Sequence, residues 1–127
     1  MTYRTILLIA GLSGALAVSL GAFGAHGLEA FLEEHGRTGT FETAVKYHFY
    51  HSLLLLALGI LGNIRPSMPY LKTAAICCIA GMVIFSGSLY ILCLTNILWL
   101  GAITPLGGIL LIASWLLTGI GAWKSYK

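Results

Sequence analysis

The sequence has few charged residues and no aspartate. Asp, Glu, Lys and Arg together make up 9% of its 127 residues, whereas a soluble domain carries about 25%. A chain so poor in charge cannot cover a surface that faces water. All four carboxylates lie in the 29–42 segment, and no set of nucleophile, base and orienting residue is visible, which disfavours a hydrolase or a kinase. A nucleic-acid partner is disfavoured too, because no basic patch is interleaved with aromatic residues.

Cysteine is scarce as well, and its spacing does not match metal or redox motifs. The three cysteines, Cys77, Cys78 and Cys93, fall in one apolar run and form no C-x-x-C pair. We interpret them as reduced, small apolar residues of a helix. The sequence therefore predicts no disulfide framework and no cofactor.

Apolar residues are what the chain has in abundance: 58% of the residues are hydrophobic and the mean hydropathy is +0.92. A membrane-spanning helix needs about 20 apolar residues. We therefore predict an all-α membrane protein, a four-transmembrane-helix bundle forming one domain over residues 1–127. The expected spans are about 4–25, 41–62, 71–94 and 103–123. The first span resembles a signal peptide, but its apolar run exceeds the about 7–15 residues of a signal core, so we interpret it as a helix.

The basic residues are distributed unequally between the two sides of the predicted membrane domain. With four spans, the N-terminus, the 63–71 loop and the C-terminus share one side. That side has no acid and carries five basic residues: Arg4, Arg65, Lys72, Lys124 and Lys127. The 26–46 segment on the other side carries two basic residues and all the glutamates. By the positive-inside rule, both termini are expected in the cytoplasm.

The first span contains a stripe of residues with almost no side chain. Spacings of four and three place them on one helix face: Ala10, Gly14, Ala17, Gly21 and Gly24. In lipid, such residues let helix backbones approach closely. The small-residue stripe is expected to pack against another helix of the chain or against a second copy, in a homo-oligomer. Membrane lipids are the other expected partners.

The segment between the first two spans is expected to hold a short helix in the membrane interface. Glycines flank His26, which predicts that the first helix ends near Ala25 and that the turn redirects His26 inward. Over 28–35, apolar residues face one side and glutamates the other, which is typical of an interfacial amphipathic helix. Gly36 is expected to end this helix, and Thr40 is a candidate N-cap for the second span.

The second span carries most of the polar residues. Glu42 and Lys46 are four residues apart, in the order that supports a solvated helix end. His48 and His51 are three residues apart and are expected to look into the bundle near its outer end. An ionisable group at membrane depth is by default a functional hypothesis. As metal ligands the two histidines are a weak candidate pair, because no third ligand lies at a fixed spacing.

Polar residues of the third span are expected to join these histidines. The "FSGSLY" segment, 85–90, supplies serines that allow close packing and a tyrosine that can reach the outer end of the bundle. The predicted polar cluster near the outer face consists of His26, Glu42, Tyr47, His48, His51, Ser86 and Tyr90. Three interpretations stay open: a site for a small ligand, ion or lipid, a proton or cation relay, and hydrogen bonding that stabilises the fold.

The last span has a helix-start signal at Thr104 and Pro105, because proline lacks the N–H that the first helical position leaves unused. A broken helix that lines a cavity, as in transporters, is the alternative. Trp99 and Trp123 are expected to anchor the outer and inner interfaces.

Four segments, in order and over essentially the whole chain, resemble a known family. They are "LGAFGAHGL", "ETAVKYHFYHSL", "FSGSLY" and "GAITPLGG". They are similar to the signature segments of the YgdD-like small membrane proteins, described as domain of unknown function 423 and related to transmembrane protein 256 of animals. The resemblance implies a four-span bundle in the bacterial inner membrane, and it implies no activity.

These observations predict a non-enzymatic integral membrane protein whose polar cluster binds a small ligand, ion or lipid or stabilises the fold. One alternative is a small transporter or channel subunit, which predicts a water-accessible path to mid-membrane. A second is a quinone- or redox-handling membrane enzyme, which predicts an apolar cleft near His48 large enough for a ring.

Overall fold

The computed structural model describes residues 1–125, and over these residues it contains helices and no strand. The helices are α1 (Tyr3–Ala25), α2 (Glu29–Glu34), α3 (Thr38–Ile64), α4 (Leu71–Thr95), the 3₁₀ helix η1 (Leu98–Ala102) and α5 (Thr104–Ser125). Four segments are long and apolar enough to cross a membrane: α1, α3, α4 and Leu98–Ser125. The predicted all-α, four-span fold is therefore confirmed. Lys127, which the charge comparison included, lies outside the described residues.

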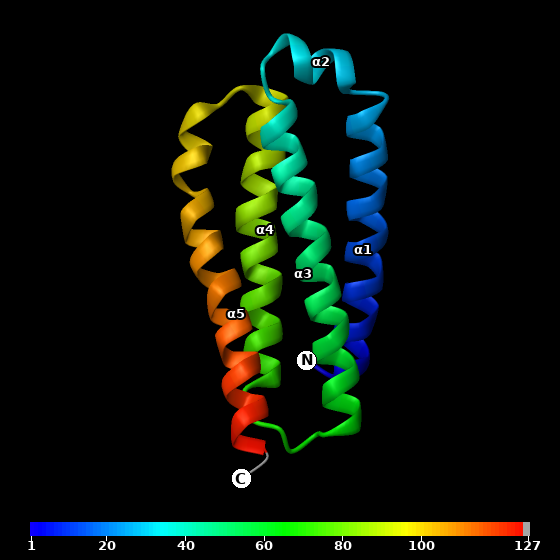
Figure 1. Ribbon diagram of the computed structural model, residues 1–127, viewed down its shortest axis with the longest axis vertical. Coiled ribbons are helices and arrows are strands. Elements are labelled where there is room, and N and C mark those ends of the chain that lie inside the picture. The colour runs from blue at the N-terminus through cyan, green and yellow to red at the C-terminus, as the bar shows by residue number, and fades with distance from the viewer. Residues whose placement is uncertain (126–127) are drawn as a thin grey trace.

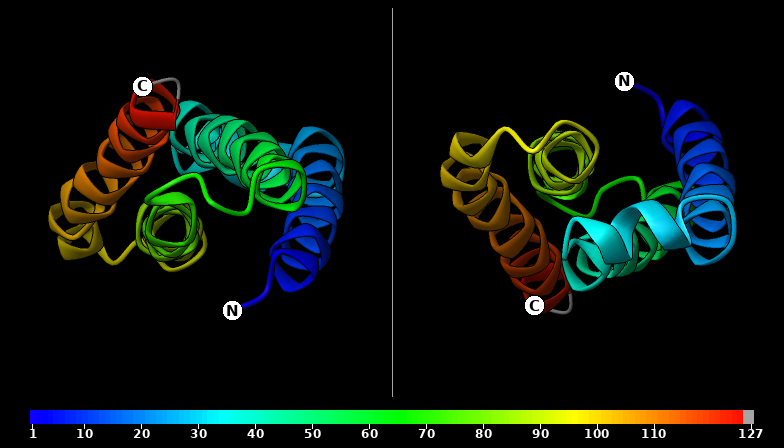
Figure 2. Two further views of the ribbon diagram at one scale, coloured as in Figure 1. Left: turned by 90° about the horizontal axis from the view of Figure 1, so that it is seen from below. Right: turned by 90° about the horizontal axis from the view of Figure 1, so that it is seen from above.

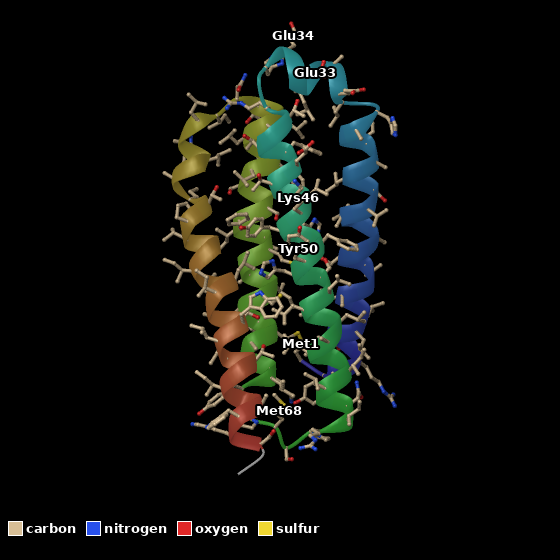
Figure 3. All side chains as sticks on the ribbon, viewed as in Figure 1. Met1, Glu33, Glu34, Lys46, Tyr50 and Met68 are labelled. Carbon is tan, nitrogen blue, oxygen red and sulfur yellow. The ribbon has the colours of Figure 1, made fainter. Side chains whose placement is uncertain are left out.

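The long helices run alternately up and down, so the connections gather at two ends. The N-terminus, the loop between α3 and α4 and the end of α5 lie at one end, and α2 and η1 lie at the other (Figure 1). Glu33 and Glu34 mark the α2 end, whereas Met1 and Met68 lie toward the opposite end (Figure 3). The two termini thus share one side, as the span count predicted.

The four long helices form an open row rather than a closed ring. Extensive packing joins α1 with α3, α3 with α4, and α4 with α5. Seen from either end, α3 and α4 occupy the centre, with α1 and α5 on the two outer sides (Figure 2). One long side of α1 and one of α5 therefore have no helix of this chain against them.

The small-residue stripe of α1 packs against α3 of the same chain. Ala10 and Ala17 are buried. A methyl group added at Gly21 would lie 3.2 Å from the Cγ1 of Val45, and one added at Gly24 would collide with the ring of Phe41. The stripe thus lets α1 and α3 approach closely, as small residues do in membranes. The homo-oligomer through this stripe stays a prediction, and a second copy would have to displace α3 to use it.

The connection between α1 and α3 matches the predicted helix but not the predicted position of His26. Leu32 of α2 is buried against the bundle, and Gly36 follows α2 with a left-handed φ of +63°. His26 is the C-terminal cap residue of α1, as expected, but its side chain is exposed rather than redirected inward. The expectation about the His26 side chain was wrong because the backbone N–H of His26 donates to the carbonyl of Phe23 as the chain turns toward α2. This turn leaves the imidazole ring outside the bundle.

Two helix starts differ in detail from the sequence predictions. α3 begins at Thr38 with Arg37 in the cap position, so Thr40 is not its N-cap. α5 begins at Thr104 with Pro105 in its first turn, as predicted, and runs without a break to Ser125. The 3₁₀ turn of η1 precedes it, so the irregular backbone lies at the bundle end, and the alternative of a helix broken inside the membrane was wrong for this span.

Candidate functional site

A groove runs between α1 and α4, with α3 at its base. Its volume is about 420 Å³, within the range of about 300–1,000 Å³ that small-molecule sites occupy. We call it the α1–α4 groove; its lining residues are Ile9, Leu12, Ser13, Leu16, Leu20, His48, Ile79, Met82, Val83, Ser86, Gly87 and Tyr90. None of them is charged. The groove exists because α1 and α4 both pack on α3 and do not pack extensively on each other.

Apart from the Ser86 hydroxyl, the polar side chains that line the α1–α4 groove belong to one hydrogen-bonded chain. The Tyr90 hydroxyl lies 3.1 Å from His48 Nδ1, and His48 Nε2 lies 3.1 Å from Ser13 Oγ. Ser13 Oγ is 2.7 Å from Ser52 Oγ, and Ser52 donates to the backbone carbonyl of His48 at 2.8 Å. Helices α1, α3 and α4 each contribute at least one member. This chain of groups is called the Tyr90–Ser52 network below.

The Tyr90–Ser52 network lies deeper in the bundle than the outer-face location predicted from the sequence. His48 is ten residues beyond the start of α3, about 15 Å along a helix that rises about 1.5 Å per residue. Ser13 is the eleventh of the 23 residues of α1, half way along. The network therefore begins near the outer end, at Tyr90, five residues before the end of α4, and extends to the middle of α1 through Ser13, which the sequence prediction did not include.

His51, also on α3, points away from the α1–α4 groove and contacts α5. Its Nδ1 donates to the carbonyl of Tyr47 at 2.7 Å, and its Nε2 accepts the indole N–H of Trp115 at 3.2 Å. The ring of Tyr47 stacks beside that of His51, with centroids 6.1 Å apart, and lies 4.7 Å from the ring of Phe85. This second group therefore joins α3 to α5 and does not line the α1–α4 groove.

Ser86 does what its position in "FSGSLY" suggested. Its hydroxyl donates to the backbone carbonyl of Ala44 at 2.8 Å, which ties α4 to α3. Ser114 makes the equivalent bond from α5 to the carbonyl of Ala74, also at 2.8 Å. Both serine side chains are buried. Ser86 also lines the groove, but its hydroxyl hydrogen is already donated to the Ala44 carbonyl.

The remaining residues of the predicted cluster lie outside the site. Glu42 forms the expected pair with Lys46, at 3.8 Å, and both side chains are exposed. Tyr47 is exposed beside His51, away from the groove, and His26 is at the end of α1. The predicted single cluster therefore separates: the Tyr90–Ser52 network holds two of its residues and the His51 group holds His51 and Tyr47. Ser86 bonds to Ala44, and Glu42 and His26 lie apart from both groups.

The geometry does not unite the two histidines as metal ligands. His48 and His51 are bonded to different helices on different sides of α3. Over residues 1–125, no three His, Cys, Asp or Glu side chains gather closely enough to hold a metal ion.

Sequence reasoning missed Ser13, Ser52 and Trp115 as members of these two groups. A signal existed for two of them. Ser13 adjoins the small-residue stripe, where a hydroxyl is brought close to the facing helix. Trp115 is the twelfth of the 22 residues of α5, and an indole N–H far from both interfaces needs an acceptor inside the protein.

Comparisons with known proteins agree with this architecture. The family described as "Protein of unknown function (DUF423)" matches residues 20–108. The chain is 42% identical to the UPF0382 membrane protein YwdK of Bacillus subtilis over 95% of its own length and 98% of the relative's. It is 36% identical to the UPF0382 inner membrane protein YgdD of Escherichia coli over 96% of its length and 92% of the relative's. No solved structure matches the chain significantly. With four membrane-spanning segments and relatives named as membrane proteins, the chain belongs to the DUF423 family of multi-pass integral membrane proteins.

Proposed function

We propose that this protein binds an uncharged, membrane-soluble molecule in the α1–α4 groove. The observation that carries the proposal is the Tyr90–Ser52 network at the base of an otherwise apolar groove. Binding sites for small molecules combine apolar walls with a few placed polar groups in this way.

The groove faces the lipid, which supports a ligand that arrives from the bilayer. Three of its lining residues expose more than half of their surface: Leu12 at 64%, Leu16 at 54% and Val83 at 68%. In a membrane these side chains meet acyl chains, so the ligand has an apolar body.

The absence of charged residues in the groove lining supports an uncharged ligand. An ion at this depth needs either a compensating charge or a path of polar groups, because its desolvation costs several kcal/mol or more. The groove offers its polar atoms along the Tyr90–Ser52 network and at Ser86, whose hydrogen is already donated to the carbonyl of Ala44. We therefore favour binding of a neutral molecule over passage of an ion.

The matched glycines of α4 and α5 provide the test. Gly87 lines the groove, and a Cβ atom added there meets nothing within 4 Å. Gly119 has the same freedom but lies outside the groove. Gly87→Leu fills the groove without a clash in the core, and Gly119→Leu controls for the added leucine.

The measurement is native mass spectrometry of each variant released gently from membranes. We expect an apolar, uncharged molecule bound to the unaltered chain and to Gly119→Leu, with occupancy at least about fivefold lower in Gly87→Leu. Thermal unfolding in detergent verifies that both variants fold. Equal occupancy in the two variants would place the ligand elsewhere and overturn the proposal.

We also propose that the protein resides in the bacterial inner membrane with both termini in the cytoplasm. Arg4, Arg65, Lys72 and Lys124 are near the end that holds the termini, and the glutamates are at the α2 end, which supports this orientation. Glu33→Cys places a thiol at the α2 end, where a membrane-impermeant maleimide is expected to label it from the periplasmic side. The unaltered chain, with cysteines only inside its spans, is the control. Labelling only after the inner membrane is opened would reverse the orientation.

A further inference from the structure

The hydrogen positions in the Tyr90–Ser52 network follow from its one fixed acceptor. The backbone carbonyl of His48 can only accept, so the Ser52 hydroxyl donates to it at 2.8 Å. The hydrogen of Ser52 is then used, and the 2.7 Å contact between the two serines requires Ser13 to donate. The sulfur of Met82 lies 3.7 Å from Ser13 Oγ and 3.9 Å from Ser52 Oγ, and as a weak acceptor it does not compete with these oxygens.

The same reasoning fixes the tautomer of His48. Because the hydrogen of Ser13 points to Ser52, the 3.1 Å contact between Ser13 Oγ and His48 Nε2 requires an Nε2–H donor. A neutral imidazole carries one N–H, so Nδ1 is an acceptor. The hydroxyl of Tyr90, 3.1 Å from Nδ1, therefore donates to it.

This order uses every hydrogen of the network and leaves the oxygen of Tyr90 able to accept. In the reverse order, Ser52 gives up its carbonyl contact and the hydrogen of Tyr90 has no acceptor within the network. The reverse order thus has one hydrogen bond fewer. The groove therefore presents an acceptor to its ligand and no free donor.

We infer that the molecule bound in the α1–α4 groove carries a hydroxyl group that donates a hydrogen bond to the oxygen of Tyr90. The inference rests on the function proposed above and names the ligand class as a long-chain alcohol or an isoprenoid hydroquinone. A carbonyl ligand needs the reverse order of hydrogens, so it gains one bond fewer than a hydroxyl ligand does. Tyr90 lies five residues before the end of α4, about 7.5 Å along a helix that rises about 1.5 Å per residue.

Competition between matched ligands tests the inference. The purified chain in detergent is mixed with equimolar farnesol and farnesyl methyl ether, and then with farnesol and farnesal, and the bound ratio is read by native mass spectrometry. One net hydrogen bond corresponds to roughly a fivefold preference, so we expect farnesol to exceed both competitors by about that factor. A short-chain isoprenoid hydroquinone competing with farnesol distinguishes a phenolic from an aliphatic hydroxyl, and either winner fits the inference.

Ser13 acts as a positioning residue, and its substitution moves a quantity that a merely structural role leaves unchanged. Ser13→Ala removes the acceptor of Nε2–H, so the His48 hydrogen is free to move to Nδ1 and Tyr90 becomes able to donate. The farnesol-to-farnesal ratio is expected to fall below about twofold. Ser19→Ala, which removes an exposed hydroxyl of α1 bonded to the carbonyl of Ala15, is the control and is expected to keep the ratio.

The possible results separate this inference from the proposed function. If farnesol, its ether and farnesal bind equally and Gly87→Leu blocks all three, the hydroxyl inference is overturned and the groove stands as a binding site. If Gly87→Leu changes none of them, or none binds saturably, the proposed function fails and the inference fails with it.

Discussion

The two sides of α3 offer a comparison between two histidines that are almost equally buried. His48 is 8% exposed and His51 is 5% exposed, and they are three residues apart on one helix. Both ring nitrogens of His51 are hydrogen-bonded within the protein, one to the Tyr47 carbonyl and one to the Trp115 indole, and the chain of hydrogen bonds stops at these two partners. The bonds of His48 continue through Ser13 in one direction and end at Tyr90, on the wall of a groove, in the other. Burial alone therefore does not distinguish the two histidines; the end point of their hydrogen bonds does, at the Trp115 indole in one case and on the groove wall in the other.

The largest effect on stability is expected from displacing α5, the helix that covers His51. A side chain at Gly107 would overlap the backbone of Phe85 in α4, so Gly107→Val forces α5 away and separates Trp115 from His51. Overpacking of this kind costs about 3 kcal/mol or more when backbone must move. Thermal unfolding in detergent measures the loss, and Gly119→Val is the matched control. Equal stability of the two variants would mean that close packing of α4 and α5 is not needed to hold the His51 side.

The next effect separates stability from binding on the His51 side. His51→Ala removes two hydrogen bonds and leaves the Trp115 indole without its acceptor, for which we expect a loss of about 1–2 kcal/mol. Thermal unfolding reports the loss, and farnesol occupancy is expected to change less than about twofold. A large loss of occupancy at unchanged stability would mean that the ligand binds beside His51 and not in the α1–α4 groove.

On the His48 side, the balance between stability and binding is expected to be reversed. Tyr90→Phe removes the hydroxyl that accepts the ligand's hydrogen bond, so farnesol binding weakens about fivefold, whereas the loss in stability stays below about 1 kcal/mol. Tyr47→Phe, a change of the same kind beside His51, is the control and is expected to keep both values. Titration followed by native mass spectrometry gives the affinity; unaltered affinity in Tyr90→Phe would contradict the comparison.

The smallest effect is expected at the exposed α2 end, outside both histidine groups. Glu42 and Lys46 are each 61% exposed, and their atoms are 3.8 Å apart. Exposed pairs of this kind contribute about 0–1 kcal/mol, so Glu42→Gln is expected to shift unfolding by less than about 0.5 kcal/mol at low salt and by nothing measurable at high salt. A larger shift that persists at high salt would mean that the Glu42–Lys46 pair stabilises the fold, contrary to this prediction.

The fold could be predicted from the sequence because it depends on quantities that local composition carries. Apolar runs of membrane-spanning length set the four helices, and Gly36 and Pro105 mark helix ends by their own backbone preferences. The contact of α1 with another helix was also predictable, because only residues as small as Gly21 and Gly24 allow it.

The division of the polar residues into two groups could not be predicted in the same way. Residues three apart on a helix differ by about 60° in direction, which is enough for His48 and His51 to reach different neighbours when several helices surround α3. Which neighbour each one meets depends on where α1, α4 and α5 sit, and local sequence does not encode that arrangement. His26 shows the complementary limit, because the direction of a side chain at a helix end depends on the turn that follows.

The open row of helices has a consequence for how a molecule reaches Tyr90. Because α1 is held by α3 along one flank and does not pack extensively on α4 (Figure 2), no interface between helices has to separate for a ligand to enter. For the ligand proposed above, entry would be lateral, from within the leaflet, and would need neither a lid nor a rocking motion. The rate of loading would then follow the ligand's diffusion and abundance in the bilayer, so the proposed binding would respond continuously to the composition of the surrounding membrane.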